Sequence, residues 1–390
     1  MSIFITLFTI LFFALLGYHL VYRNPGGRFH LSGAAFLLVG YLLGPDLLGI
    51  LDEKTATELT PLSGLVTGWV GLMYGLQLDL PFMKRLTPPF LLSVCLDTGL
   101  TLLMFLGGTF VLFPLLGPEY TLSLALTIAA TAACSSQAAL VMASPRLKPT
   151  RSATALMRIA TAGSLISLCI FASAFFFSSP SPSADGLSME IRTDLPTILM
   201  ATAVLVVLYT LFFSERRRRE EMILIVTGMV VLTSGLAASH HFPPLLANGI
   251  TGFFLGNTTR YRDRILSMVI ILEKPLYLLL LILLGARHIP LSSALLGTAA
   301  LYLLLRSLAK MGGGFLISLL HTDIVLPKSS GTGLLEQGGL ALAICFDAQN
   351  AFANPVTHNL VTAILLATLV SDLTGRLTWG DLVPVREKKP

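Results

Sequence analysis

Long apolar runs separated by short charged loops make up most of this 390-residue sequence. A membrane-spanning α-helix needs about 20 predominantly apolar residues, and the chain holds about 13 runs of that size. Hydrophobic residues account for 54% of the chain and charged residues for only 12%, which is not the balance of a soluble domain. Lipid offers no partners to backbone N–H and C=O groups, so spans of this length must be helical. The sequence therefore predicts an all-α polytopic membrane protein in contact with a lipid bilayer.

Basic residues collect in every second loop between the predicted spans. Eighteen Lys and Arg residues fall on one side and three on the other, namely Lys54, Arg192 and Arg287. Because cytoplasmic loops carry the excess of Lys and Arg, the N-terminus is predicted outside and the C-terminus in the cytoplasm. The net charge of +5 follows from the same bias, so no nucleic-acid partner is expected. The predicted spans lie near residues 2–22, 31–51, 62–80, 89–115, 121–143, 153–177, 195–214, 221–240, 243–257, 265–286, 291–319, 331–350 and 358–377.

Two of the predicted spans contain a polar break. Residues 331–347 open with glycines and place Glu336 and Gln337 before two more glycines, and residues 131–137 interrupt an earlier apolar run with Thr, Cys, Ser and Gln. Glycine loosens a helix, and a carboxylate at membrane depth is costly unless it faces protein or water. Secondary transporters use paired half-helices of this kind to place backbone dipoles and ligands near the middle of the membrane. The two breaks predict a secondary transporter.

The breaks occupy equivalent places in two halves of the chain. A Ser/Pro-rich loop and a charged connector flank the seventh span, which we interpret as a linker helix. An odd number of spans separates equivalent helices, so the two halves run in opposite directions and form an inverted repeat. The expected parts are a transmembrane domain at 1–377, with a first repeat at about 31–177, a linker helix at 195–214 and a second repeat at about 243–377, and a short cytoplasmic tail at 378–390.

Four motifs resemble segments of the monovalent cation:proton antiporter-2 family. They are, in order, Gly40–Gly49 (GYLLGPDLLG), Gly71–Leu78, Glu273–Ala286 and Glu336–Leu342 (EQGGLAL). The resemblance covers residues 1 to about 377 and implies crossed discontinuous helices in a mobile core domain. It also implies a scaffold domain that forms a homodimer, an elevator-type exchange of Na⁺ or K⁺ for protons, and a bacterial-type inner (plasma) membrane.

One position departs from the family. Aligning Arg151-Ser-Ala153 with the family's sixth span puts Ala160 and Thr161 where an Asn-Asp or Gln-Asp pair is expected, and this span contains no acid. Lys310 resembles the core lysine that pairs with that aspartate elsewhere in the family. The resemblance therefore supplies the lysine but not its usual carboxylate.

Polar residues within the predicted spans are the candidates for the transport site, because they are costly in lipid. Hydroxyl and amide oxygens at the first break can ligate a dehydrated Na⁺ or K⁺, or can serve helix packing. The candidates for ion binding and transport are Thr131, Ser135, Ser136, Gln137, Thr161, Lys310, Glu336 and Gln337. Secondary charged candidates, for which structural ion pairs are the alternative, are Asp97, Arg158, Glu273, Lys274 and Arg306.

Two acidic residues are open to a second interpretation. Asp97 either replaces the missing acid of the sixth span or forms a structural salt bridge. Asp347, far along the twelfth span, is interpreted as a cap for amides at the end of a span.

The leading hypothesis is exchange of a monovalent cation for protons by alternating access, with Glu336 and Lys310 compensating charge. The alternatives are an anion or organic-acid carrier built around Lys310, Arg306 and Arg158, and a transport-inactive sensor or partner subunit. Glu336 or Asp97 at the helix crossing favours cations, whereas only Lys and Arg there favours anions. No catalytic order, metal spacing or phosphate loop is present, so no enzyme, cofactor or metal site is expected.

Overall fold

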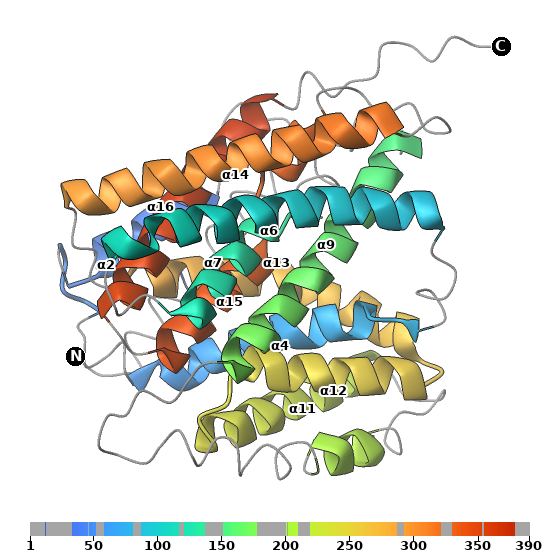
Figure 1. Ribbon diagram of the computed structural model, residues 1–390. Helices are drawn as coiled ribbons and strands as arrows, with labels where there is room; N and C mark the ends of the chain where they lie inside the picture. The colour runs from blue at the N-terminus through green and yellow to red at the C-terminus, as the bar shows by residue number, and fades with distance from the viewer. Residues whose placement is uncertain are drawn as a thin grey trace. The chain divides into compact units, whose positions relative to one another are not determined.

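The computed structural model describes residues 12, 33–45, 47–51, 58–80, 87–116, 121–136, 151–177, 200, 202–209, 219–286, 292–320, 330–352 and 355–378. All regular structure in these ranges is helical, which confirms the predicted all-α fold class (Figure 1). The elements are α2 (Gly33–Leu43), α4 (Thr60–Gln77), α6 (Pro88–Leu116), α7 (Leu122–Ala133), α9 (Arg151–Phe176), α11 (Arg219–Ser239), α12 (Pro244–Thr258), α13 (Arg262–Gly285), α14 (Ser293–Leu320), the 3₁₀ helix η1 (Ser330–Leu334), α15 (Gly339–Ala351) and α16 (Pro355–Thr378).

Among the residues that the structure describes, four helices are long and apolar enough to cross a membrane unaided: α6, α9, α11 and α14. Helix α13 passes the same test as two segments bent by 42° around Pro275, where the missing amide and the ring of proline break the helical ladder. Leu103, Leu224 and Leu304 are 70%, 75% and 56% exposed on these helices. Side chains this apolar and this exposed suit contact with lipid tails rather than with water.

Helix α2 is shorter than the predicted second span, residues 31–51. It ends at Leu43, and Gly44 and Pro45 begin a turn that closes with a hydrogen bond of 2.9 Å from Gly49 N to Gly44 O. Gly49 adopts a φ of 61°, a conformation that glycine enters without the penalty other residues meet. The glycines of this motif therefore end the helix instead of continuing it.

The chain divides into two compact units, each assembled from separate stretches of sequence. The first unit consists of residues 1–85, 179–289 and 346–352, and it holds α2, α4, α11, α12 and α13. The second consists of residues 86–178, 290–345 and 353–390, and it holds α6, α7, α9, α14, η1 and α16. Helix α15 begins in the second unit, and its last residues belong to the first.

Glycines bring helices of the first unit into backbone contact. A Cβ added at Gly71 of α4 would lie 2.1 Å from the carbonyl oxygen of Leu245 in α12, and one at Gly75 would lie 2.1 Å from that of Gly249. Helices α2 and α13 meet in the same way, since a Cβ at Gly40 would lie 2.2 Å from the carbonyl oxygen of Ile282. Small residues allow this close approach, which is the usual means of packing helices in membranes.

The second unit surrounds the two predicted breaks, and both are present. Helix α7 ends at Ala133, and Cys134 takes an extended conformation with φ −59° and ψ 142°. The second break lies at residues 335–338, between η1 and α15. Glu336 therefore lies in the non-helical segment between the two half-helices, at the polar break that the sequence predicted. Figure 1 shows α6 and α14 running side by side within this unit.

Candidate ion-transport site

The two breaks touch each other through backbone and hydroxyl groups. The amide of Ser136 donates to the carbonyl oxygen of Glu336 at 2.8 Å, and the Ser135 hydroxyl donates to that of Leu334 at 3.1 Å. Gly338 keeps the segments close, because a Cβ there would lie 3.3 Å from the Cα of Ser136. Four sequence-predicted candidates, Ser135, Ser136, Glu336 and Gln337, thus meet at one crossing, and all four are buried.

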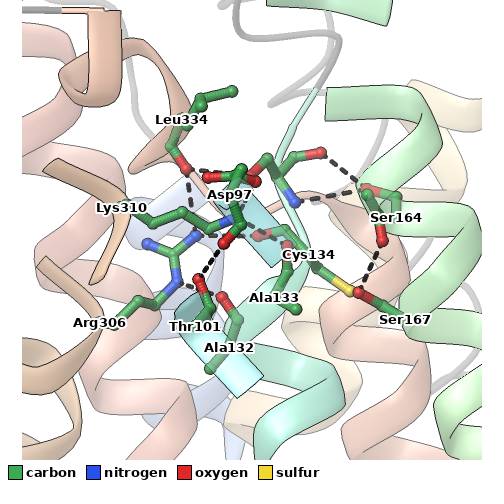
Figure 2. A network of polar contacts seen from close by, with 12 residues as sticks. Asp97, Thr101, Ala132, Ala133, Cys134, Ser164, Ser167, Arg306, Lys310 and Leu334 are labelled. Atoms are coloured by element: carbon green, nitrogen blue, oxygen red, sulfur yellow. Dashed lines mark hydrogen bonds and ion pairs between the residues drawn. The ribbon is translucent and has the colours of Figure 1, made fainter. Parts of the chain in front are cut away.

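Arg306 of α14 binds carbonyl groups from both breaks (Figure 2). Its Nε donates to Ala132 O at 3.1 Å, and its Nη2 donates to Cys134 O at 2.9 Å and to Leu334 O at 3.4 Å. Its Nη1 donates to the carbonyl oxygen of Leu335. The last carbonyls of a helix have no intrahelical partner and carry the negative end of its dipole, so a fully buried guanidinium there satisfies both needs.

Lys310, one turn further along α14, forms an ion pair with Asp97 of α6 (Figure 2). Its Nζ lies 2.7 Å from Asp97 Oδ2 and also donates to the carbonyl oxygen of Ala133 at 2.8 Å. Both side chains are almost completely inaccessible, at 0% and 1% exposure. Gly313 allows this approach, since a Cβ there would lie 3.1 Å from the Cα of Asp97. Lys310 therefore has a carboxylate partner, and it comes from α6.

Asp97 faces the helix that lacks the expected acid. A Cβ added at Gly163 of α9 would lie 3.7 Å from Asp97 Oδ2 and 3.0 Å from Thr98 Oγ1. Asp97 Oδ1 and Thr98 Oγ1 are both buried and without a hydrogen-bond partner among the described residues. The absent side chain of Gly163 leaves room for these two groups beside α9.

Hydroxyl groups of α9 hold the first break where the family resemblance predicts a carboxylate. Ser164 Oγ accepts a hydrogen bond from Ser135 N at 3.3 Å and donates to Ser135 O at 3.1 Å (Figure 2). The Ser167 hydroxyl contacts the sulfur of Cys134. Ala160 is fully buried in an apolar cluster with Val94, Leu156, Ile159, Ile317 and Leu334. Serines 164 and 167 were not among the predicted site residues, although both follow Thr161 at helical spacing.

Gln337 is the centre of a second buried hydrogen-bond network. Its Nε2 donates to Thr131 O at 3.0 Å and to the hydroxyl of Tyr302 at 2.8 Å, and its Oε1 accepts a hydrogen bond from Thr368. The Tyr302 hydroxyl lies 3.5 Å from that of Thr131, which itself donates to Ile128 O at 2.7 Å. Gln337 and Thr131 were among the predicted site residues, whereas Tyr302 and Thr368 were not. Tyr302 lies one turn before Arg306 on the same face of α14, a spacing that could have identified it.

The remaining candidates lie elsewhere on α9, in the first unit, or outside the described residues. Thr161 is half-buried, and its hydroxyl donates to Met157 O of its own helix at 2.8 Å. Arg158 is exposed on α9, so it does not join Arg306 and Lys310 in a buried cationic cluster. Glu273 is half-buried on α13 in the first unit. Gln137 and the side chain of Lys274 lie outside the described residues.

The site holds both signs of charge. Among the described residues of the second unit, the buried charged side chains are Asp97, Arg306, Lys310 and Glu336. No group of three or more His, Cys, Asp and Glu side chains in the described ranges could hold a metal ion. The arrangement thus offers carboxylate and hydroxyl oxygens beside the carbonyl ends of two half-helices, the chemistry that suits a monovalent cation or a proton.

The fold that carries these two broken helices is similar to that of a sodium proton antiporter. Two solved structures share it over almost the whole chain, and both are of MjNhaP1 from Methanocaldococcus jannaschii. The structure at pH 8 has a TM-score of 0.65 and 16% identity and covers 97% of each chain. An electron-microscopy structure has a TM-score of 0.65 and 18% identity and covers 99% of each chain. Both are structures of one transporter.

No family model matches the sequence, and no curated protein matches it.

Proposed function

We propose that the protein is a secondary transporter that exchanges a monovalent cation, Na⁺ or K⁺, for protons. The observation that carries this proposal is the buried Asp97–Lys310 pair beside the crossing of the two broken helices. A carboxylate in this setting must be neutralised, because an unpaired charge in a membrane interior is costly. Lys310, a proton and a metal cation can each neutralise Asp97, and competition among them couples the movement of one ion to the other.

Asp97 takes over the part that a carboxylate in the sixth span has in the resembled family. Its Oδ2 and the Thr98 hydroxyl lie against Gly163 of α9, two residues after the position where the aspartate was expected. The free Oδ1 of Asp97 and the free Oγ of Thr98 are oxygen ligands of the kind that a partly dehydrated cation requires. The site then needs no carboxylate on α9, since the carboxylate comes from α6.

The hydrogen bonds of Arg306 and Lys310 argue against an anion or organic-acid carrier. Arg306 uses Nε, Nη1 and Nη2 on four backbone carbonyls, and Lys310 donates to Asp97 and Ala133. An anion would have to displace these acceptors, which would leave the carbonyls at the helix ends unsatisfied. Arg306 and Lys310 thus have a structural role, and Asp97 is the group that exchanges its bound ion.

The mechanism that we propose is elevator-type alternating access, with the second unit as the moving core and the first as a scaffold that forms a homodimer. The glycine contacts support the inverted repeat on which such motion depends. In the predicted repeat, the third span corresponds to the tenth and the ninth to the second. The third and ninth spans are α4 and α12, and the tenth and second are α13 and α2. The pairs α4–α12 and α2–α13 are therefore equivalent, and both pack through glycines. We further propose a plasma membrane location with the N-terminus outside and the C-terminus in the cytoplasm, which rests on the basic loops.

Proton flux in proteoliposomes tests the proposal. The full chain is reconstituted with a pH dye trapped inside, and Na⁺, K⁺ or Li⁺ is added to wild type, Asp97→Asn, Glu336→Gln and Asp79→Asn. Asp79 is a matched control, since it also pairs with a basic residue, Arg262, at 3.3 Å but is about one-fifth exposed. We expect cation-driven proton movement in wild type and Asp79→Asn, and none in Asp97→Asn.

Two results would contradict the proposal. Flux that survives Asp97→Asn but is lost in Glu336→Gln would move the carrier to Glu336. No response to any cation in folded, membrane-inserted wild type would favour the transport-inactive alternative.

A further inference from the structure

Asp347 is a buried carboxylate of the first unit, 2% exposed, on the last turns of α15. Its Oδ2 accepts a hydrogen bond of 2.8 Å from the amide of Leu245 in the first turn of α12. Pro243 precedes this helix and supplies no side-chain cap. The expected capping role of Asp347 is thus seen in the structure, and the capped helix is α12.

The amide of Leu245 is the one N–H at the start of α12 that needs an outside partner. Pro244 has no N–H, and the amides of Leu246 and Ala247 both donate to Pro243 O, at 3.0 and 3.1 Å. The first amides of a helix lack intrahelical acceptors, and the positive end of the helix dipole lies there. Asp347 therefore supplies both a hydrogen-bond acceptor and a negative charge at the N-terminus of α12.

The other carboxylate oxygen is left without a partner. Asp347 Oδ1 is buried and accepts no hydrogen bond from the residues that the structure describes. No Lys, Arg or His side chain in those residues forms an ion pair with Asp347, in contrast to Asp97 with Lys310. The Thr67 hydroxyl lies beside the carboxyl group, and it also donates to Gly64 O at 3.3 Å. One amide and one hydroxyl replace little of the hydration that an ionised carboxylate loses on burial.

Within the part of the chain that the structure describes, the helices around Asp347 bring no charged group to it. Helix α12 carries no titratable side chain, α4 carries Tyr74, and α15 adds Cys345. The turn that leads into α12 carries His240, which is half-buried, and His241, which is exposed. A proton is the smallest ligand that removes the charge of Asp347 and fills the bare oxygen while Oδ2 still accepts from Leu245.

We propose that Asp347 is a proton-binding site, separate from the Asp97–Lys310 pair, whose occupancy sets how strongly α15 caps α12. When ionised, Asp347 attracts the amide and the positive helix end together. When protonated, it keeps the hydrogen bond but loses the attraction between charge and dipole. Helix α15 begins directly after the break that carries Glu336 and Gln337, so a change in its anchoring acts on the segment that bears that break. The site concerns the first unit and does not depend on which ion is transported.

Infrared difference spectroscopy of the reconstituted full chain tests this site without measuring transport. Only a protonated carboxyl group has a carboxyl C=O stretch, so a titrating Asp347 contributes a band to the difference between acid and alkaline samples. Spectra are compared over about pH 5 to 9, the range in which buried acids titrate, for wild type, Asp347→Asn, Asp97→Asn and Asp79→Asn. We expect one band to be absent in Asp347→Asn and present in the other two variants. A spectrum unchanged by Asp347→Asn, or a band lost equally in Asp97→Asn, would overturn the proposal.

Thermal stability supplies a second measurement. Asn keeps an oxygen acceptor for Leu245 N and stays neutral at every pH, so Asp347→Asn is expected to fold and to mimic the protonated state. The difference in Tm between wild type and this variant should therefore change with pH. A difference that stays constant from acid to alkaline conditions would show that Asp347 keeps one protonation state, against the proposal.

Discussion

Lys310 Nζ lies 2.7 Å from Asp97 Oδ2, although the two residues are 213 positions apart in the chain. The pair is buried, and Lys310 also binds the carbonyl of Ala133 at the end of α7. Through these two contacts the Lys310 side chain joins α6, α14 and the first broken helix. Burying two charges is costly and their attraction repays much of that cost, so the loss of one partner alone is the damaging change.

Single and double substitution of this pair should give unequal effects. Lys310→Met leaves Asp97 buried without its cation and should destabilise the protein by about 3–5 kcal/mol. Asp97→Asn combined with Lys310→Met should destabilise by clearly less than the sum of the single changes, because no unpaired charge remains. Thermal unfolding of the three purified variants in detergent measures these effects. Strict additivity would contradict the direct pairing.

Arg306→Lys should weaken the crossing although the charge is kept. Lysine has one donor atom and cannot reach four carbonyl groups in a planar fork. We expect a loss of at least about 3 kcal/mol, since hydrogen bonds to charged groups are worth about 1.5–3 kcal/mol each and two or more are lost. Unfolding of Arg158→Lys is the matched control, because that arginine is exposed on α9 and should tolerate the change. Equal stability of the two variants would refute the clamp role of Arg306.

Gly71→Ala should disrupt the packing of α4 against α12. The new methyl group would lie 2.1 Å from Leu245 O, so a backbone must move. Overpacking of a tight interface costs about 1–3 kcal/mol, and backbone atoms cannot rotate away as side chains do. Gly228→Ala in α11 meets nothing within 4 Å, and it should be neutral or stabilise its helix by about 0.5–1 kcal/mol. Melting temperatures of the two variants, measured side by side, check the contrast.

Gln337→Leu should destabilise the second break through the partners that it leaves behind. Tyr302, Thr131 and Thr368 each lose a hydrogen bond in a buried setting. An unsatisfied buried polar group costs about 1–3 kcal/mol, so the total should exceed that of Thr368→Val, which removes a single donor. Unfolding measurements on both variants test the order, and a larger effect of Thr368→Val would contradict the central place of Gln337.

Much of the helix pattern could be predicted from the sequence alone. The predicted spans at 89–115, 153–177 and 291–319 differ by at most two residues from α6, α9 and α14, because uninterrupted apolar runs between charged loops leave little choice of boundary. Both breaks were also predicted, since glycine and polar residues in an apolar run disfavour a continuous helix. The second span was predicted too long, since the turn that starts at Gly44-Pro45 outweighed the apolar residues after it.

The partners of the buried charges could not be predicted in this way. Asp97 stood between two interpretations, and the sequence did not state which helix supplies the carboxylate partner of Lys310. A helical period states which face a residue lies on but not which helix packs against that face. Thr368 was missed for the same reason, because a single hydroxyl in a span is common and its role depends on the helix that packs against it.

The sequence by itself determined that this chain spans a membrane with helices, and that two of them are broken, because the cost of burying polar groups in lipid acts on each segment separately. Only the tertiary structure decided that Lys310 pairs with Asp97, that Arg306 holds both breaks, and that Asp347 caps α12. Those choices depend on distances between segments far apart in the chain. Such distances are set by glycine-mediated helix packing and by the pairing of buried charges, and no single segment encodes them.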